Sequence, residues 1–126
     1  MKLSVMVVED DAVTGMALER LLKSHGCTVI GPCAHGDTAL KIADLKRPDV
    51  ALLDIRLAGW MNGILTARSL SESYRIPLIF ITGQDTPERR VEAMALKPLA
   101  YLLKPLNESQ LLGILEEIEA KLHPKA

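Results

Sequence analysis

The chain has 126 residues, of which 48% are hydrophobic and 25% are charged, and its formal net charge at pH 7 is -1. This length predicts one domain over residues 1–126, large enough to bury a core without disulfides. Lys and Arg are scattered along the sequence and no apolar run approaches a membrane span, which argues against direct binding of nucleic acid or of a membrane.

The first predicted strand ends in a run of acids. Residues 3–8 are rich in Val, and three carboxylates follow them directly: Glu9, Asp10 and Asp11. Asp11 has the position of a helix cap, since apolar residues recur at helical spacing after it, as far as Gly26: Val13, Ala17, Leu18, Leu21 and Leu22. Because the chain opens on a strand, and not on a signal peptide, we expect a soluble, untargeted protein.

An edge strand and a second helix follow. Residues 27–33 have the composition of a strand, and Gly31 and Pro32 within it favour the edge of a sheet. The next helix begins at Gly36 and ends before Pro48, with an apolar stripe of Leu40, Ala43 and Leu45.

The two cysteines, Cys27 and Cys33, flank this second strand. An extended chain would separate them by about 20 Å, and a disulfide spans roughly 7 Å at most. We therefore expect two free thiols and a cytoplasmic location.

The third predicted strand, residues 50–55, is an unbroken apolar run except for Asp54 near its carboxyl end. A run with no polar face is typical of a strand that is buried on both sides. Because burial of an isolated charge is costly, Asp54 needs a cation, a base or solvent beside it.

The alternation continues after Asp54. A loop over residues 56–61 leads to a helix over 62–73, whose sheet-facing residues are expected to be Ile64, Leu65, Ala67 and Leu70. The fourth strand, residues 78–81, is apolar on both faces and ends at Thr82 and Gly83.

The last third of the chain contains two helices and a strand. Thr86 and Pro87 start a helix that carries Val91, Met94 and Ala95. A fifth strand over residues 100–103 is closed by Lys104, and Asn107 caps a final helix that buries Leu111, Ile114, Leu115, Ile118 and Leu122.

Five strands alternating with five helices predict an α/β fold, a doubly wound parallel sheet with right-handed crossovers. Ligands of such sheets bind beyond the carboxyl ends of the strands. The residues expected at that edge are Glu9, Asp10, Asp54, Thr82 and Lys104.

The tetrapeptide Leu-Lys-Pro-Leu occurs twice, with its lysines at Lys97 and Lys104. The first lysine precedes the fifth strand and the second follows it. Because a four-residue strand is about 13 Å long, only Lys104 can reach the acidic edge.

The acids at this edge predict a cation site. Two carboxylates about 5 Å apart repel each other by roughly 3 kcal/mol at an effective dielectric constant near 20. Hard oxygen ligands without neighbouring His or Cys favour Mg²⁺, with Mn²⁺ possible, over Zn²⁺. With the Thr82 hydroxyl, the Gly83 amide and Lys104, the site has the parts for phosphoryl transfer to Asp54. No organic cofactor is expected.

The chain resembles, from end to end, the receiver domain of two-component response regulators. In that family an acidic pair follows the first strand, a phosphoacceptor Asp ends the third, Thr or Ser ends the fourth and Lys-Pro follows the fifth; here these are Glu9-Asp10, Asp54, Thr82 and Lys104-Pro105. The resemblance implies a flavodoxin-like sheet with strand order 2-1-3-4-5.

The resemblance also implies roles for single residues. Mg²⁺ would be held by Asp10, Asp54 and the backbone carbonyl of Arg56, with Glu9 contributing through water. Thr82 and Lys104 would contact the phosphoryl oxygens. Tyr101 matches the aromatic switch position, whose ring turns inward when Thr82 moves toward the phosphoryl group, and the Lys104-Pro105 bond would be cis.

Two features depart from the common family pattern or vary within it. The loop after Asp54, residues 58–63, is one residue longer than usual and lacks a Pro. It resembles a subgroup of receivers that is often fused to sensor or kinase modules. Arg56 and Gln84 occupy positions that tune phosphoryl lifetime in the family.

The implied function is a phosphorylation-switched signalling module. A sensor histidine kinase or phosphotransfer protein would supply a phosphoryl group from phosphohistidine to Asp54. The fourth helix, fifth strand and fifth helix would then bind a downstream protein target or a fused effector domain, through a surface that includes Arg89, Arg90, Tyr101 and Lys104. The phosphorylated form could pair as a homodimer. Such a domain is not an enzyme, since it catalyses only its own phosphorylation and dephosphorylation.

Two other functions remain open from the sequence. A Mg²⁺-dependent phosphohydrolase commonly needs a second Asp two residues after its nucleophile, where this chain has Arg56. A receiver-like interaction module that is never phosphorylated would not need the complete set of polar residues. Taken singly, the acids fit a solvated strand end, Asp54 fits a structural cap and Tyr101 fits plain packing.

Overall fold

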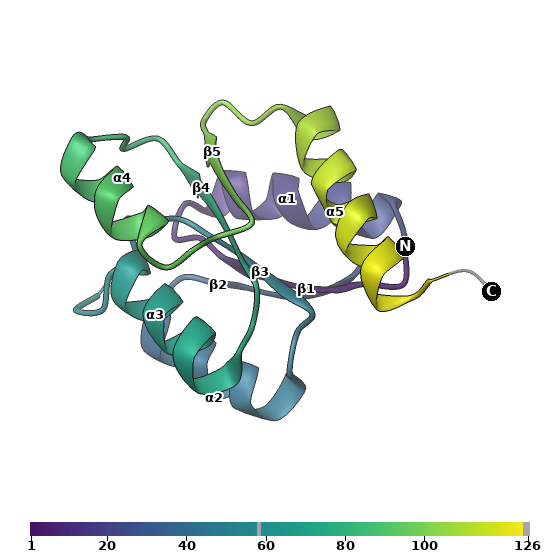
Figure 1. The fold of residues 1–126 in the computed structure, drawn as a ribbon, viewed down its shortest axis with the longest axis horizontal. Coiled ribbons are helices and arrows are strands. Elements are labelled where there is room, and N and C mark those ends of the chain that lie inside the picture. Colours follow the sequence, from purple (N-terminus) through teal and green to yellow (C-terminus); the bar gives the residue numbers. More distant parts are fainter. Residues whose placement is uncertain (58, 125–126) are drawn as a thin grey trace.

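The computed structural model of the chain describes residues 1–57 and 59–124. Its centre is a five-stranded parallel sheet with the strand order β2-β1-β3-β4-β5 (Figure 1). The strands are β1 (Ser4–Val8), β2 (Thr28–Cys33), β3 (Val50–Leu53), β4 (Leu78–Thr82) and β5 (Ala100–Leu103). The helices are α1 (Ala12–Ser24), α2 (Gly36–Lys46), α3 (Gly63–Tyr74), α4 (Pro87–Met94) and α5 (Glu108–Leu122). The predicted α/β class, strand order and number of helices are confirmed.

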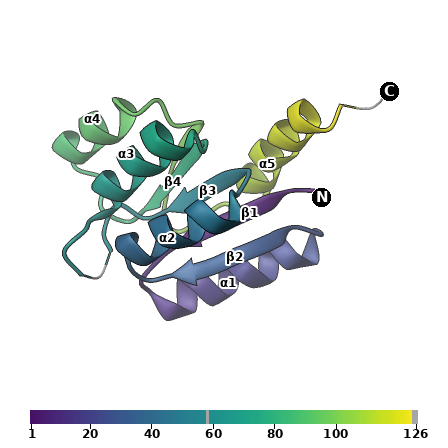
Figure 2. The same cartoon turned by 90° about the horizontal axis from the view of Figure 1, so that it is seen from below.

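Helices cover both faces of the sheet (Figures 1 and 2). Alternate residues of one strand enter different cores: Ala51 and Leu53 pack with α2, α3 and Ala93 of α4, whereas Val50 and Leu52 pack with α1 and α5. All four residues of β3 are buried, as the unbroken apolar run predicts. The doubly covered sheet therefore fixes the direction in which each strand end points.

The helix faces differ in part from the predicted ones. Several apolar side chains that the sequence analysis assigned to the helices are exposed: Val13, Ala17, Leu45, Leu65, Val91, Met94, Ala95 and Leu122. Small residues occupy some of the inward positions of four helices: Gly15, Ala39, Ala43, Thr66 and Ala93. The helical period alone does not distinguish two neighbouring stripes, and small side chains let the helix backbones approach the sheet closely.

The second strand lies at the edge of the sheet, as Gly31 and Pro32 indicate. Its register against β1 shifts between Met6 and Val8. The Lys104-Pro105 bond is cis, as the family resemblance implies, and Gly31-Pro32 is also cis, which the sequence analysis did not anticipate.

Both cysteines are buried free thiols, and this prediction is confirmed. Burial raises the pKa of each thiol above its ordinary value, so both remain protonated at neutral pH. Among the residues that the structure describes, no helix has the length and apolar character needed to cross a bilayer.

The correction on α3 can be tested with two leucines of the same helix. Leu70 is fully buried, whereas Leu65 is 41% exposed. We expect Leu70→Ala to lower the free energy of unfolding by about 2–5 kcal/mol, because it leaves a cavity in the core. Leu65→Ala should cost less than about 1 kcal/mol. Urea unfolding followed by circular dichroism measures both, and equal losses would contradict the inward face assigned to α3.

Candidate functional site at the carboxyl edge of the sheet

A pocket of about 400 Å³ lies beyond the carboxyl ends of β1, β3, β4 and β5. Its lining consists of Glu9, Asp10, Asp11, Asp54, Arg56, Gly83, Gln84 and Lys104. Thr82 is buried at the end of β4 and directly precedes Gly83, which lines this pocket. The structure therefore brings the residues expected from the strand ends to one place.

Strand pairing forces the two buried acids together. Val8 of β1 pairs with Leu53 of β3, so Glu9 and Asp54, the next residues, leave neighbouring strands at the same level. The Asp54 amide also donates a hydrogen bond to the Val8 carbonyl, at 3.0 Å. Both carboxylates are buried, and each carries a charge that needs a partner.

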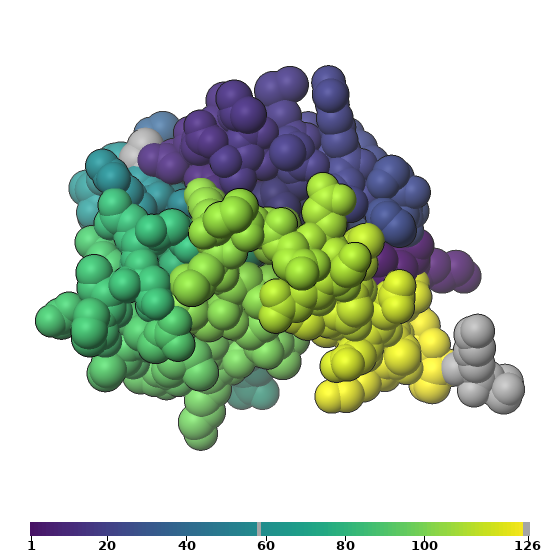
Figure 3. Space-filling view, turned by 90° about the horizontal axis from the view of Figure 1, so that it is seen from above, coloured from purple at the N-terminus to yellow at the C-terminus, as the bar shows by residue number. Residues whose placement is uncertain are grey.

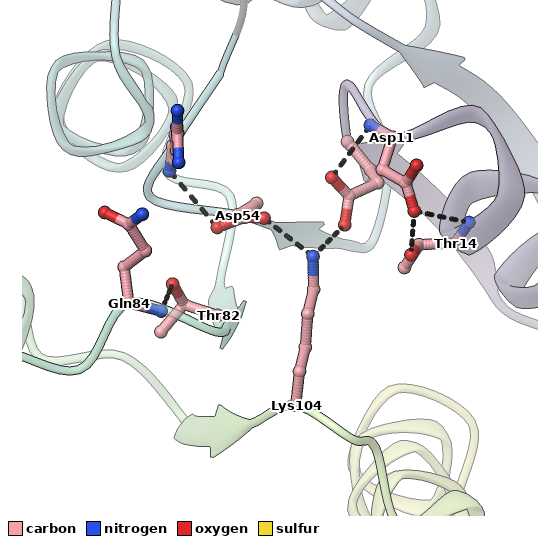
Figure 4. Close-up of polar contacts among 8 residues, drawn as sticks. Asp11, Thr14, Asp54, Thr82, Gln84 and Lys104 are labelled. Carbon is pink, nitrogen blue, oxygen red and sulfur yellow. Dashed lines mark hydrogen bonds and ion pairs between the residues drawn. The ribbon is translucent and has the colours of Figure 1, made fainter.

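Lys104 supplies that partner (Figure 4). Its Nζ donates to Glu9 Oε1 at 2.6 Å and to Asp54 Oδ2 at 2.8 Å. Burial lowers the pKa of Lys104, but the hydrogen bonds to the two carboxylates outweigh it and leave the pKa above its ordinary value. Lys97 precedes β5, at its amino end, and does not line this pocket. The prediction that Lys104 and not Lys97 reaches the acidic edge is therefore confirmed.

Burial also changes the titration of Glu9. Loss of solvent raises its pKa above the ordinary value, although the hydrogen bond from Lys104 acts in the opposite direction. The Asp11 amide donates a further hydrogen bond to Glu9 Oε2, at 3.2 Å. The Glu9 carboxylate is thus held from two sides and has a fixed orientation toward the pocket.

The acidic cluster has the donor set for a divalent cation. Glu9, Asp10 and Asp54 each offer a carboxylate oxygen, and these oxygens lie within 4.8 Å of one another. Asp10 is exposed, so one ligand faces solvent where an ion would enter. Oxygen-only ligands fit Mg²⁺ or Mn²⁺. Asp54 Oδ1 accepts a hydrogen bond from the Arg56 amide at 3.1 Å, which folds residue 56 back to the pocket.

Asp11 has a structural role, as predicted. Its carboxylate accepts hydrogen bonds from the amide and the hydroxyl of Thr14 in the first turn of α1. These bonds lower the pKa of Asp11. The third acid of the run is therefore the cap of α1 and is separate from the cluster of three carboxylates.

Thr82 and Gln84 lie on the other side of Asp54 (Figure 4). The Thr82 hydroxyl accepts a hydrogen bond from the Gln84 amide at 3.0 Å, and the Lys104 amide donates to the Thr82 carbonyl at 2.9 Å. The backbone after β4 and the base of the Lys104 side chain are thus tied to the same residue.

The sequence analysis missed the role of Gly63. The first residue of α3 donates its amide to the Ile55 carbonyl at 2.7 Å, and a Cβ at this position would lie 1.9 Å from the carbonyl oxygen of Asp54. Only a glycine permits this approach. In the loop before it, Trp60 is exposed, and Ala58 lies outside the described residues.

Tyr101 lies on β5, and its ring is half-buried beside Phe80 with 6.2 Å between ring centroids. Its hydroxyl donates to Asp85 Oδ1 at 3.1 Å. The guanidinium carbon of Arg90 stands 5.0 Å from the ring centroid. The sequence analysis named Tyr101 and Arg90 on the expected output surface, but it did not anticipate Asp85 or the contacts among the three residues.

Comparison with known proteins decides the family. Residues 5–116 match the family model described as the response regulator receiver domain. The chain belongs to the response regulator receiver family. The receiver domain of a modulated diguanylate cyclase from Desulfovibrio desulfuricans G20 is similar in structure, with a TM-score of 0.89, 34% identity and 96% of each chain covered.

Curated relatives agree with this assignment. The transcriptional regulatory protein YpdB of Escherichia coli K12 is 33% identical over 120 residues, which are 94% of this chain and 48% of the relative. The transcriptional regulatory protein PdtaR of Mycobacterium tuberculosis is 30% identical over 115 residues, 89% of this chain and 54% of the relative. The chain thus spans about half the length of these relatives. Receiver domains generally bind Mg²⁺, and the three carboxylates fit such an ion.

Removal of Lys104 tests the charge balance of the receiver site. In Lys104→Met, two buried carboxylates lose their cation, so in EDTA we expect the free energy of unfolding at pH 7 to fall by about 1–3 kcal/mol. The loss should shrink as the pH falls through the raised pKa of Glu9, because this carboxyl group then becomes neutral. It should persist up to the raised pKa of Lys104 and vanish above it.

Urea unfolding at a series of pH values measures this loss. Lys97→Met is the matched control, because it makes the same substitution in the other copy of Leu-Lys-Pro-Leu, at an exposed position outside the pocket. A loss independent of pH, or one equal in both variants, would contradict the assignment of Lys104 as the counter-ion.

Proposed function

We propose that the chain is a phosphoacceptor receiver domain over residues 1–126, in which Asp54 takes a phosphoryl group from a phosphohistidine of a partner protein. The observation that carries the proposal is the position of the Asp54 carboxylate. It lines an open pocket, with one oxygen bonded to Lys104 Nζ and the other to the Arg56 amide. Two of its lone pairs are thereby oriented, and the remaining ones are available to an incoming phosphorus.

The transfer is an in-line displacement. A carboxylate oxygen of Asp54 forms a bond to phosphorus while the bond from phosphorus to the imidazole nitrogen of the donor breaks, and that nitrogen keeps the electron pair. Lys104 stabilises the charge that spreads over the phosphoryl oxygens. A Mg²⁺ ion held by Asp10, Asp54 and the Arg56 carbonyl, with Glu9 through water, would neutralise further charge. Gly83 is placed to offer its amide, and Thr82 its hydroxyl.

The acyl phosphate then changes the population of two conformations. Thr82 is fully buried in the structure, and its hydroxyl is engaged by the Gln84 amide. That bond uses the hydroxyl oxygen as an acceptor, so a phosphoryl group at Asp54 would supply a charged acceptor for the hydroxyl's own hydrogen. We propose that Thr82 moves toward that acceptor and that the Tyr101 ring turns inward in response.

The surface that reads this change is proposed to be α4, β5 and α5, which lie side by side on the face shown in Figure 3. Among these elements, α4 and β5 expose large apolar side chains at Val91, Met94 and Leu103. Response regulators interact with histidine kinases and downstream targets. Here the proposed partners are a sensor histidine kinase or phosphotransfer protein and a downstream protein or fused effector domain, with a homodimer as the possible phosphorylated form.

Two further parts of the proposal concern chemistry and location. The receiver family is generally not a family of enzymes in the usual sense, and we propose that this chain catalyses only its own phosphorylation and dephosphorylation. The two free thiols are in the state that a reducing compartment maintains, which supports a cytoplasmic location.

Phosphorylation of Asp54 can be tested by intact-protein mass after incubation with Mg²⁺ and acetyl phosphate. We expect the wild type to gain one phosphoryl group and Asp54→Asn to gain none, because the amide is not a nucleophile for phosphorus. EDTA should abolish the gain. The control Asp44→Asn removes a carboxylate from α2, away from the pocket, and should be phosphorylated as the wild type is.

A wild type that gains no phosphoryl group from acetyl phosphate or from a panel of histidine kinases, and that binds no Mg²⁺, would instead support a receiver-like interaction module. Multiple turnover of a phosphoester would support a phosphohydrolase. A phosphoryl group found on Asp54→Asn would place the acceptor at another residue.

Substitutions of two adjacent acids can distinguish the proposed metal ligand, Asp10, from the helix cap, Asp11. Asp10→Asn should weaken Mg²⁺ binding at least about tenfold, because a neutral amide is a poorer ligand than a carboxylate. Asp11→Asn should change the affinity little, since Asn caps a helix about as well as Asp. Titration calorimetry gives both constants, and fluorescence of Trp60, the single tryptophan, gives an independent readout. Equal weakening by both variants would contradict the division of roles.

A further inference from the structure

Three side chains from three segments meet beside the site. Asp85 precedes α4, Arg90 belongs to α4 and Tyr101 belongs to β5. Arg90 makes two hydrogen bonds to Asp85, from Nε to Oδ1 at 3.0 Å and from a terminal nitrogen to Oδ2 at 2.7 Å. Tyr101 donates its hydroxyl to Asp85 Oδ1, and the guanidinium of Arg90 stands over the Tyr101 ring. Each member of this cluster thus contacts the other two.

This closed arrangement fixes the direction of the Tyr101 side chain. The ring packs against the core near Phe80, while the hydroxyl is held at the surface by an exposed carboxylate. The planar guanidinium fits both the carboxylate and the ring face, which a compact ammonium group would not do equally well. The hydrogen bonds from Arg90 keep the pKa of Asp85 below its ordinary value, so the acceptor is ionised at neutral pH.

The cluster is connected to the phosphoryl site through a short piece of backbone. Asp85 follows Gln84, whose amide binds the Thr82 hydroxyl. On the other side, Tyr101 pairs with Phe80 and Leu103 pairs with Thr82, so β5 lies against the segment that ends at Thr82. A displacement of Thr82 toward Asp54 therefore pulls on the residue that accepts the Tyr101 hydrogen bond.

We propose that Asp85 and Arg90 are positioning residues that latch Tyr101 in its resting, surface-directed orientation, and that phosphorylation acts in part by opening this latch. The inference rests on the proposed function, because it assigns regulation to the same site. It adds residues that neither the strand-end motifs nor the carboxylate cluster includes.

The latch has the right strength for a switch. Its contacts are exposed, and an exposed ion pair and an exposed cation–π contact together shift a two-state equilibrium by about threefold to tenfold. Such a bias keeps the resting state dominant, yet it can be reversed by a new charged contact at Thr82. Loss of the latch should therefore raise the population of the inward Tyr101 state without any phosphoryl group.

The test uses the two tyrosines of the chain, Tyr74 and Tyr101. Protein labelled with 3-fluorotyrosine gives one ¹⁹F NMR signal for each, and Tyr74→Phe assigns them. In the unphosphorylated protein, Arg90→Ala should move the Tyr101 signal toward its position in the phosphorylated wild type. The initial rate of phosphorylation by acetyl phosphate should rise about threefold to tenfold. Asp85→Ala should give the same two effects, and Arg90→Lys should give intermediate ones.

Arg89→Ala is the matched control, because it removes the same charge from the same helix. Within the part of the chain that the structure describes, the Arg89 side chain makes no hydrogen bond or ion pair. It should leave the Tyr101 signal and the phosphorylation rate as in the wild type. Circular dichroism checks that each variant is folded.

The outcomes separate the latch from the proposed function. A wild type that takes up no phosphoryl group overturns the proposed function and the latch with it. A wild type that is phosphorylated, with Arg90→Ala and Asp85→Ala indistinguishable from Arg89→Ala in signal and rate, overturns the latch alone and leaves Asp85 and Arg90 as an ordinary surface ion pair.

Discussion

The carboxyl edge of the sheet depends on one electrostatic constraint, the neighbouring placement of two buried carboxylates. Pairing of β1 with β3 brings carboxylate oxygens of Glu9 and Asp54 within 4.8 Å of each other, and at this distance two like charges oppose each other by roughly 3 kcal/mol at an effective dielectric constant near 20. Lys104, from the far side of β4, compensates both with a single ammonium group. The same demand for positive charge makes the pocket receptive to a divalent cation.

Much of this arrangement could be predicted from the sequence because it follows from strand ends. Alternating strands and helices determine a parallel sheet, and in a parallel sheet all carboxyl ends share one edge. Residues directly after a strand, such as Asp54 and Lys104, inherit their position from it. The inward helix faces were harder to predict, because small residues such as Ala93 pack closely without standing out as hydrophobic. An eight-residue helix gives too few turns for its period to be read.

The contacts that the sequence did not reveal involve residues whose positions depend on the conformation of a loop. Asp85 and Tyr101 are 16 residues apart, and nothing in their spacing indicates that a carboxylate will meet a phenol. Their meeting depends on how the chain leaves β4 and enters α4. The roles assigned to Asp10, Thr82 and Arg56 are of another kind: their places follow from the fold, whereas their chemistry rests on the family and on the experiments described above.

The close packing of Gly63 against the backbone of Asp54 has a consequence for how this domain tolerates change. Gly63 is required because it lacks a Cβ, since any side chain at this position would displace the backbone carbonyl of Asp54. A position with no functional group is therefore as restrictive as the proposed phosphoacceptor whose backbone it touches. Redesign of the neighbouring loop could vary its length and its exposed residues, but it would have to return the chain to a glycine at the start of α3.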